Sequence, residues 1–441
     1  MTHLKTISHS IGLGCAGLAF MLAASAGASV HAAEADVAAF YKGKNIVWLS
    51  GFNRGGYVRT SRIISRYMHR YIPGKPGIDT AAITTNGGID MVNHFYTKSK
   101  RDGTVIAIVG RDMPTHPLIG HRKTVYDVTK MNFIGNVNGG DTHMIAWHKS
   151  GLASLKDVIK KGTIRVGTSR GNSETFAVVA NNMLTKAGLL KGAKIVVVAE
   201  YPAMLDVVLA MKRGDIDGMA GIHMGRYAKG SSFERSNPGA IAAGKIKAIL
   251  RYENLQDMIS DPVDKQALEL IFSRQKTSRI YVLPPGVPAA RVAALRKAFM
   301  ATMKDPAFIK EAKRGRIKIE PLSGAQLQAR IAKLYAFPKA AVERAQWAIK
   351  TRPTLIKAKP KKAFKATITG KKRMRRGMRR LLLTRADGSK VTAVLHPRRS
   401  RVTIGGKRVR GRKVRRALKD GINCSIAWSG PGGTAMRIDC P

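Results

Sequence analysis

Cysteine and acidic residues are scarce in this chain. Beyond the N-terminal apolar stretch only Cys424 and Cys440 remain, and neither has a close histidine or second cysteine, which argues against a metal site. The chain has 27 acidic residues against 78 Lys and Arg, a net charge of +51. No later apolar stretch is long enough to cross a bilayer. We therefore expect neither a metalloprotein nor a protein with several membrane spans, and no cofactor.

Residues 1–32 predict a cleaved signal peptide. Lys5 lies in a polar start, Ile11 to Ala28 is apolar and rich in small residues, and Val30-His31-Ala32 is a small-x-small cleavage pattern. The alternative is an uncleaved anchor, which the short apolar stretch and the lack of a basic stop disfavour. We expect a periplasmic protein. In an oxidising compartment a Cys424–Cys440 disulfide is favoured over two free thiols.

The positive charge extends over the whole chain and is densest at its C-terminal end. Residues 351–441 hold 27 of the 78 basic residues and three of the 27 acidic ones. A chain-wide excess fits a solvated surface at least as well as a polyanion ligand. One hypothesis is a cationic envelope protein that binds polyanions or an anionic surface through residues 351–441. The basic cluster 371–380 lacks aromatic residues, so it has no side chains on which the bases of a nucleic acid could stack.

Apolar runs alternate with amphipathic segments from residue 36 to about 350. This alternation predicts an α/β fold with mostly parallel sheets and helices on both faces. The expected strands are residues 45–50, 78–84, 105–109, 132–136, 144–147, 164–168, 194–198, 218–221, 248–251 and 278–283. The expected helices are residues 57–71, 88–98, 155–160, 174–187, 201–213, 289–304, 306–314 and 324–334.

The C-terminal part changes character. Residues 351–376 are basic, contain Pro353 and Pro360, and predict a linker. Residues 377–441 predict a small all-β module, because glycine turns separate short apolar runs. Its expected strands are residues 381–384, 391–395, 401–404, 423–428 and 434–438.

Three glycine-bearing loops each follow an expected strand and precede an expected helix. They are residues 51–57, 85–88 and 167–173. Backbone N–H groups at such a loop and at the helix N-terminus bind anions without a charged side chain. Glycine-rich turns are often only turns, so one loop alone is weak. Three of them in an exported chain favour capture of a small acid.

An enzymatic alternative rests on Gly167-Thr168-Ser169-Arg170-Gly171, which matches the G-x-S-x-G nucleophile elbow of α/β-hydrolases. In that hypothesis Ser169 is the nucleophile of a secreted esterase. Asp215 or Asp217 and then His223 follow in the required order. No HGGG-like oxyanion loop is present, and we expect a protein without catalytic activity.

Several segments together resemble the substrate-binding proteins of tripartite tricarboxylate transporters, the Bug-type periplasmic receptors. The resemblance covers about residues 40–350. It rests on FYKGK at 40–44, Gly51-Phe52 with Gly55-Gly56-Tyr57, YIPGKP at 71–76, RDGT at 101–104, AWHKSG at 146–151 and RGDIDG at 213–218. The resemblance implies a two-lobed, Venus-flytrap receptor over residues 33–350. It also implies a monomer that delivers a small organic acid to a membrane permease.

In such receptors the ligand's carboxylate lies between the lobes, held by the glycine-bearing loops. The positions carried over are Phe52, Asn53, Gly55, Gly56, Tyr57, Asn86, Gly87, Gly88, Thr168, Ser169, Asn172 and Ser173. Where the family has a proline and three glycines, this chain has Asn53-Arg54-Gly55-Gly56. We expect Arg54 to add a bidentate partner for an acid group.

Overall fold

The computed structural model describes most of the chain after the expected signal peptide. The described residues are 34–52, 56–85, 88–119, 124–140, 142–169, 174–222, 239–240, 242–315, 317–352, 354–374, 377–397, 399–411 and 413–441. The expected signal peptide at 1–32 lies outside them. None of the helices in these ranges is long and apolar enough to cross a membrane.

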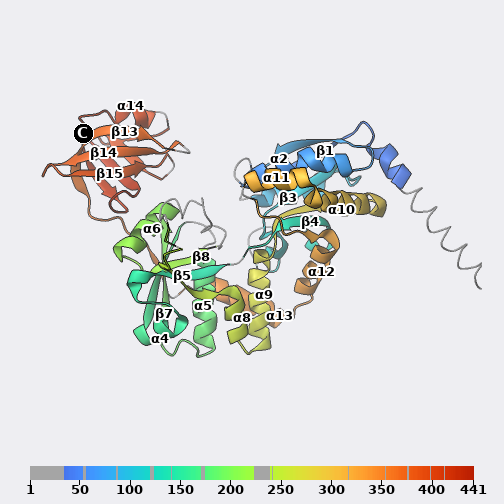
Figure 1. Ribbon diagram of the computed structural model, residues 1–441, viewed down its shortest axis with the longest axis horizontal. Helices are drawn as coiled ribbons and strands as arrows, with labels where there is room; N and C mark the ends of the chain where they lie inside the picture. The colour runs from blue at the N-terminus through green and yellow to red at the C-terminus, as the bar shows by residue number, and fades with distance from the viewer. Residues whose placement is uncertain are drawn as a thin grey trace, which may run out of the picture. The chain divides into compact units, whose positions relative to one another are not determined.

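The chain divides into two compact units, and each unit is discontinuous in sequence (Figure 1). Unit 1 contains residues 1–139 and 273–337, and unit 2 contains residues 140–272 and 338–441. The chain therefore leaves unit 1, builds most of unit 2, returns, and leaves again. Each unit has its own six-stranded mixed sheet.

The unit 1 sheet has the order β11-β4-β10-β3-β1-β2. β1 is parallel to β2 and β3, whereas β10 runs antiparallel between β3 and β4. The strands are β1 (Asn45–Ser50), β2 (Gly77–Ala82), β3 (Val105–Val109), β4 (Asn132–Asn138), β10 (Ser278–Leu283) and β11 (Leu322–Ser323). The carboxyl ends of β1, β3 and β4 thus share one edge with the amino end of β10.

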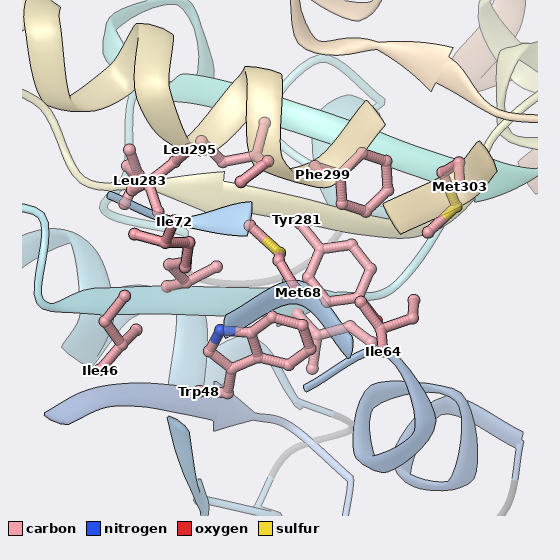
Figure 2. Packing of buried hydrophobic residues seen from close by; sticks show 14 of the residues in the cluster. Ile46, Trp48, Ile64, Met68, Ile72, Tyr281, Leu283, Leu295, Phe299 and Met303 are labelled. Atoms are coloured by element: carbon pink, nitrogen blue, oxygen red, sulfur yellow. The ribbon is translucent and has the colours of Figure 1, made fainter. Parts of the chain in front are cut away.

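Helices of unit 1 include α2 (Gly56–Met68), α3 (Ile89–Lys98), α10 (Ala289–Lys304), α11 (Pro306–Arg314) and α12 (Gly324–Tyr335). α2, α10 and α11 cover one face of the sheet, where the alternating residues of β1, β3 and β10 point. Figure 2 shows Trp48 of β1 beside Tyr281 of β10, with Phe299 of α10 above them; the ring centroids are 4.9 and 5.4 Å from that of Tyr281. This packing fixes where α2 begins relative to the sheet edge.

Unit 2 contains a sheet of order β12-β7-β6-β8-β5-β9. Its strands are β5 (His143–Trp147), β6 (Thr163–Ser169), β7 (Lys194–Tyr201), β8 (Gly218–Ile222), β9 (Ile246–Arg251) and β12 (Leu355–Lys357). Its helices include α4 (Leu155–Lys161), α5 (Glu174–Lys186), α6 (Met204–Arg213), α8 (Tyr252–Met258), α9 (Pro262–Phe272) and α13 (Lys339–Lys350). β12, β7, β6 and β8 are parallel, and β5 is antiparallel to β8 and β9.

A C-terminal β module with its own apolar core completes unit 2 (Figure 1). Its sheet has the order β15-β14-β13-β18-β19-β16-β17. The elements are β13 (Phe364–Arg373), β14 (Arg379–Arg385), β15 (Lys390–Leu395), β16 (Arg401–Ile404), β17 (Lys407–Val409), α14 (Lys413–Ala417), β18 (Asn423–Trp428) and β19 (Ala435–Cys440). Cys424 and Cys440 form the expected disulfide within this core.

The range expected as a linker, 351–376, contains two strands. β12 extends the unit 2 sheet by pairing with β7, and β13 lies between β14 and β18 in the module sheet. The sequence does not single out β13, because only Ala366 and Ile368 alternate into the core and the strand ends in the basic run Lys371-Lys372-Arg373. The segment between these strands, residues 358–363, is much shorter than the linker that the sequence suggested.

Candidate functional site

A cavity of about 270 Å³ lies at the carboxyl edge of the unit 1 sheet. It is lined by Gly51, Phe52, Tyr57, Gly88, Ile89, Met91, Val92, Gly110, Arg111, Asp112, Met113, His116 and Tyr126. Gly51 and Gly110 directly follow β1 and β3. Ligands of sheets with parallel strands bind beyond this edge, where the loops gather. The cavity is therefore the candidate site in unit 1.

The first two glycine loops meet in this cavity. A Cβ atom placed on Gly51 would lie 2.7 Å from the Cα of Gly88, a distance that real Cβ atoms do not adopt. Gly88 has φ +91°, which disfavours any residue with a side chain. Both positions therefore require glycine, and the close approach brings the N-termini of α2 and α3 to one cavity.

Two aromatic rings form one wall of the cavity. Phe52 and Tyr57 stack with ring centroids 4.4 Å apart. The Tyr57 hydroxyl accepts a hydrogen bond from the Arg111 backbone N–H at 3.3 Å. The Phe52 N–H donates to Ser50 Oγ at 3.0 Å. These contacts hold the start and the end of the first loop, and tie it to the residue that follows β3.

Charged groups at the same edge include residues that the sequence analysis missed. Asp112 pairs with Arg274 at 3.0 Å, and Arg111 and His116 line the cavity. Arg279, the second residue of β10, lies with its guanidinium carbon 5.8 Å from the centroid of the Tyr57 ring. None of these charged residues belongs to a glycine motif. In the sequence each is only a charged residue near an apolar strand, and that pattern is too common to identify a site residue.

The third loop follows β6 in unit 2. Thr168 is 1% exposed, and its Oγ1 has no hydrogen-bond partner among the described residues. A buried hydroxyl without a partner is unfavourable, which makes Thr168 a candidate ligand donor. Gly167 allows β6 to pack closely against α6, because a Cβ atom at this position would lie 2.7 Å from Val207 Cγ1.

Several predicted site residues lie outside the described residues. They are Asn53, Arg54, Gly55, Asn86, Gly87, Asn172 and Ser173, and for Ser169 only the backbone is described. The structure brings together Phe52, Gly56, Tyr57 and Gly88 in unit 1, and places Thr168 in unit 2.

The acids of the esterase hypothesis are both held by cations. Asp217 accepts from Lys161 Nζ at 2.9 Å and from the backbone N–H of Arg165 at 2.7 Å. Asp215 accepts from Lys361 Nζ at 2.7 Å and Arg213 Nε at 2.9 Å. Burial opposes ionisation of Asp215, but these two hydrogen bonds outweigh it and hold its pKa below the usual value. His223 lies outside the described residues, so neither acid is seen orienting a histidine.

A larger, open groove of about 860 Å³ runs between α2 and α11. Five of its eleven lining residues are basic, namely Arg59, Arg62, Arg66, Lys310 and Arg314. The groove lies along the helices and not at a sheet edge, and its one acid, Glu311, already pairs with Arg66 and Tyr67. Among the described residues no group of His, Cys, Asp and Glu is suited to hold a metal ion. The cavity at the strand ends thus remains the better site.

Comparison with solved structures identifies the fold. A TctC solute-binding protein from Polaromonas superposes with a TM-score of 0.50 at 16% identity, covering 69% of this chain and 99% of that one. MatC from Rhodopseudomonas palustris with bound malate (TM-score 0.41, 14% identity, 69% and 99% covered) and the periplasmic binding protein BugD (0.41, 17%, 70% and 99%) also align. No protein-family model matches the sequence, and neither does any curated protein. The two α/β units therefore have the fold of a periplasmic solute-binding protein, with the β module added.

Proposed function

We propose that this chain, which has the fold of a TctC solute-binding protein, is an extracytoplasmic receptor for a small organic acid. The observation that carries the proposal is the close approach of Gly51 and Gly88 at the edge of the unit 1 sheet. α2 and α3 begin close to this point, and the first N–H groups of a helix lack an intrahelical partner and favour an anion. The receptor binds its ligand reversibly and needs no nucleophile, metal or cofactor.

The proposed contacts come from both units. Unit 1 supplies Phe52, Asn53, Arg54, Gly55, Gly56, Tyr57, Asn86, Gly87 and Gly88, and unit 2 supplies Thr168, Ser169, Asn172 and Ser173. Amides and hydroxyls satisfy a carboxylate by hydrogen bonds, and the stacked rings of Phe52 and Tyr57 provide an apolar wall for its carbon chain. Thr168 Oγ1, which has no hydrogen-bond partner among the described residues, supports the contribution of unit 2, because a ligand oxygen could accept its hydrogen bond.

Delivery to a membrane permease completes the proposal. The loaded receptor, a monomer, presents its ligand to a tripartite tricarboxylate-type transporter. The predicted signal peptide supports a periplasmic location, and so does the Cys424–Cys440 disulfide, because disulfides persist in oxidising compartments.

Thermal-shift screening of the mature chain, residues 33–441, tests the proposal. The panel is acetate, succinate, adipate and citrate, each with its amide as an uncharged control. We expect at least one acid to raise the melting temperature and its amide to have no effect. A folded protein that responds to none of the acids would refute the proposal. Hydrolysis of an activated ester that is lost in Ser169→Ala would favour the esterase instead.

A second function is favoured by the β13–β14 hairpin. Lys372 faces Arg380 and Arg373 faces Arg379 across the two strands. Like charges directly opposite each other destabilise a sheet, so an anionic partner would stabilise this end of the hairpin. Residues 351–441 are therefore proposed to bind an anionic surface.

The triple variant Lys372→Gln/Arg373→Gln/Arg380→Gln should lose binding to phosphatidylglycerol vesicles, and salt should weaken wild-type binding. Binding that is insensitive to both would refute this second proposal.

A further inference from the structure

Arg279 lies at the same sheet edge as the cavity although it comes from a distant part of the chain. Ile280 pairs with Val109, the last residue of β3, and Ser278 pairs with Asn138, the last residue of β4. β10 is antiparallel to both, so its first residues lie beside the carboxyl ends of β3 and β4. Arg279 is thus next to the point where Gly110 and Arg111 line the cavity.

The backbone of Arg279 is strained. Its φ is +59°, a left-handed conformation that residues with a side chain adopt rarely. Such a conformation costs on the order of 1 kcal/mol and persists only where the surroundings impose it. Strain of this kind is concentrated at ligand sites, so the position needs an explanation from function.

The guanidinium of Arg279 points at the start of α2. Nη1 donates to Asn138 Oδ1 at 2.8 Å, which fixes the plane of the group. A Cβ placed on Gly56, the first residue of α2, would lie 3.3 Å from Nη2. The guanidinium carbon is 5.8 Å from the centroid of the Tyr57 ring, which lines the cavity. The cation therefore reinforces the positive end of the helix.

No acid neutralises this cation among the described residues. Arg279 makes no ion pair there, its Nε is buried without a hydrogen-bond partner, and Arg111 and Arg59 add positive charge nearby. Burial lowers the pKa of the guanidinium, which nevertheless stays charged at neutral pH. By contrast, Arg274 at the same edge pairs with Asp112. A half-buried charge without a counterion is costly, and an anionic ligand would remove this cost.

We infer that Arg279 is a ligand-binding and specificity-determining residue, whose guanidinium donates to an anionic group of the ligand at the N-terminus of α2. The inference rests on the proposed function and adds a charged side chain to a site otherwise built from amides and hydroxyls. A charge-assisted hydrogen bond is about twice as strong as a neutral one. Arg279 therefore selects a carboxylate over its amide.

Calorimetry with Arg279→Gln tests the inference. The probes are the panel acid that binds wild type with the lowest Kd, chosen from acetate, succinate, adipate and citrate, and the amide of that acid. We expect Arg279→Gln to weaken binding of the acid at least tenfold, whereas the amide should show no detectable binding to either wild type or the variant. Arg279→Lys keeps the positive charge but lacks the planar guanidinium, so its affinity for the acid should lie between those of wild type and Arg279→Gln. Arg62→Gln, on α2 in the basic groove, is the matched control and should bind like wild type.

The melting temperature separates a binding role from a structural one. Since Arg279→Gln removes an uncompensated charge, it should melt at or above the wild-type temperature, and a large decrease with an unchanged Kd would show a structural role. Acid binding by Arg279→Gln as tight as wild type would overturn the inference while leaving the receptor intact. A wild-type protein that binds no acid would overturn both. If the glutamine variant does not fold, Arg279→Lys carries the same comparison, and unchanged discrimination between acid and amide would overturn the inference.

Discussion

Gly51 and Gly88 lie so close together that a Cβ atom on Gly51 would come within 2.7 Å of the Gly88 Cα. The group in the way is backbone and cannot rotate aside. One side chain at this point must therefore displace either the end of β1 or the start of α3. Because both ends contribute to the cavity, the contact links the packing of unit 1 to its proposed binding activity.

Gly51→Ala should reduce acid binding by more than tenfold and lower the melting temperature by several degrees. The methyl group forces apart the two loops that supply the amide donors, and overpacking typically costs about 1–3 kcal/mol. Gly110→Ala is the control, since its Cβ would meet Phe52 Cζ at an ordinary 3.7 Å. Calorimetry and thermal unfolding measure both effects. Equal behaviour of the two variants would contradict the steric argument.

Thr168→Val should separate binding from stability. Valine has nearly the shape of threonine and removes a buried hydroxyl without a partner, so the free energy of unfolding should stay the same or rise. Acid affinity should fall, because the ligand loses a donor. Thr302→Val is the matched control: its Oγ1 donates to Ala298 O at 2.8 Å, so this variant should lose about 1 kcal/mol of stability with unchanged affinity. Undiminished acid binding by Thr168→Val would remove Thr168 from the site.

Asp206 attaches the β module to α6. It is fully buried and accepts hydrogen bonds from Ser429 Oγ, from Thr434 N–H at 2.6 Å and from Thr434 Oγ1 at 2.8 Å. Asp206→Ala leaves three buried donors without an acceptor and should destabilise the protein by about 3–5 kcal/mol. Limited proteolysis should then cut at residues 358–363 and release the module. Asp257→Asn, an exposed change in α8, should leave the digestion pattern unchanged.

Acid should weaken the same attachment through Asp215. Burial disfavours its charged form, but hydrogen bonds from Lys361 and Arg213 lower its pKa below the usual value near 4. Since the folded pKa is depressed, the stabilisation is complete above about pH 5 and is lost as the pH falls through the folded pKa. Unfolding curves of wild type and Asp215→Asn should therefore differ at pH 5–7, and the difference should shrink only as the pH falls below about 4 towards the depressed folded pKa. A constant difference down to pH 2 would contradict this account.

Removing the disulfide should affect the module and not the binding site. Cys424 and Cys440 are 16 residues apart, and closing a loop of that length stabilises a fold by about 3 kcal/mol in the chain-entropy model. Cys424→Ser/Cys440→Ser should lower the stability of the module by about this amount, as urea unfolding measures. Acid affinity should not change. A parallel loss of affinity would show that the module takes part in binding.

The sequence predicted most strands because their apolar runs are distinct. β1, β3 and β10 have the expected bounds. α13 was missed because its buried residues Ala341, Ala345 and Ala348 give little apolar contrast. Residue 201 was assigned to a helix, but Tyr201 ends β7 and α6 begins at Met204. β13 was missed because only Ala366 and Ile368 of its ten residues are buried and its last three residues are all basic.

The site was partly predictable for a similar reason. Glycine turns after strands identify Gly51 and Gly88 locally. Arg279 could not be found in this way, since it reaches the cavity edge only because β10 inserts between β3 and β4. This strand order depends on the packing of Tyr281 against Trp48 and Phe299, which are far apart in the sequence. A local sequence pattern does not encode such contacts.

Isothermal titration calorimetry of the mature wild-type protein with acetate, succinate, adipate and citrate tests the central claim most directly. The account predicts one-to-one saturable binding of at least one acid with a micromolar or lower Kd, and none of the corresponding amide at the same concentration. No heat of binding from any of the four acids, with a folded and monomeric sample, would contradict it.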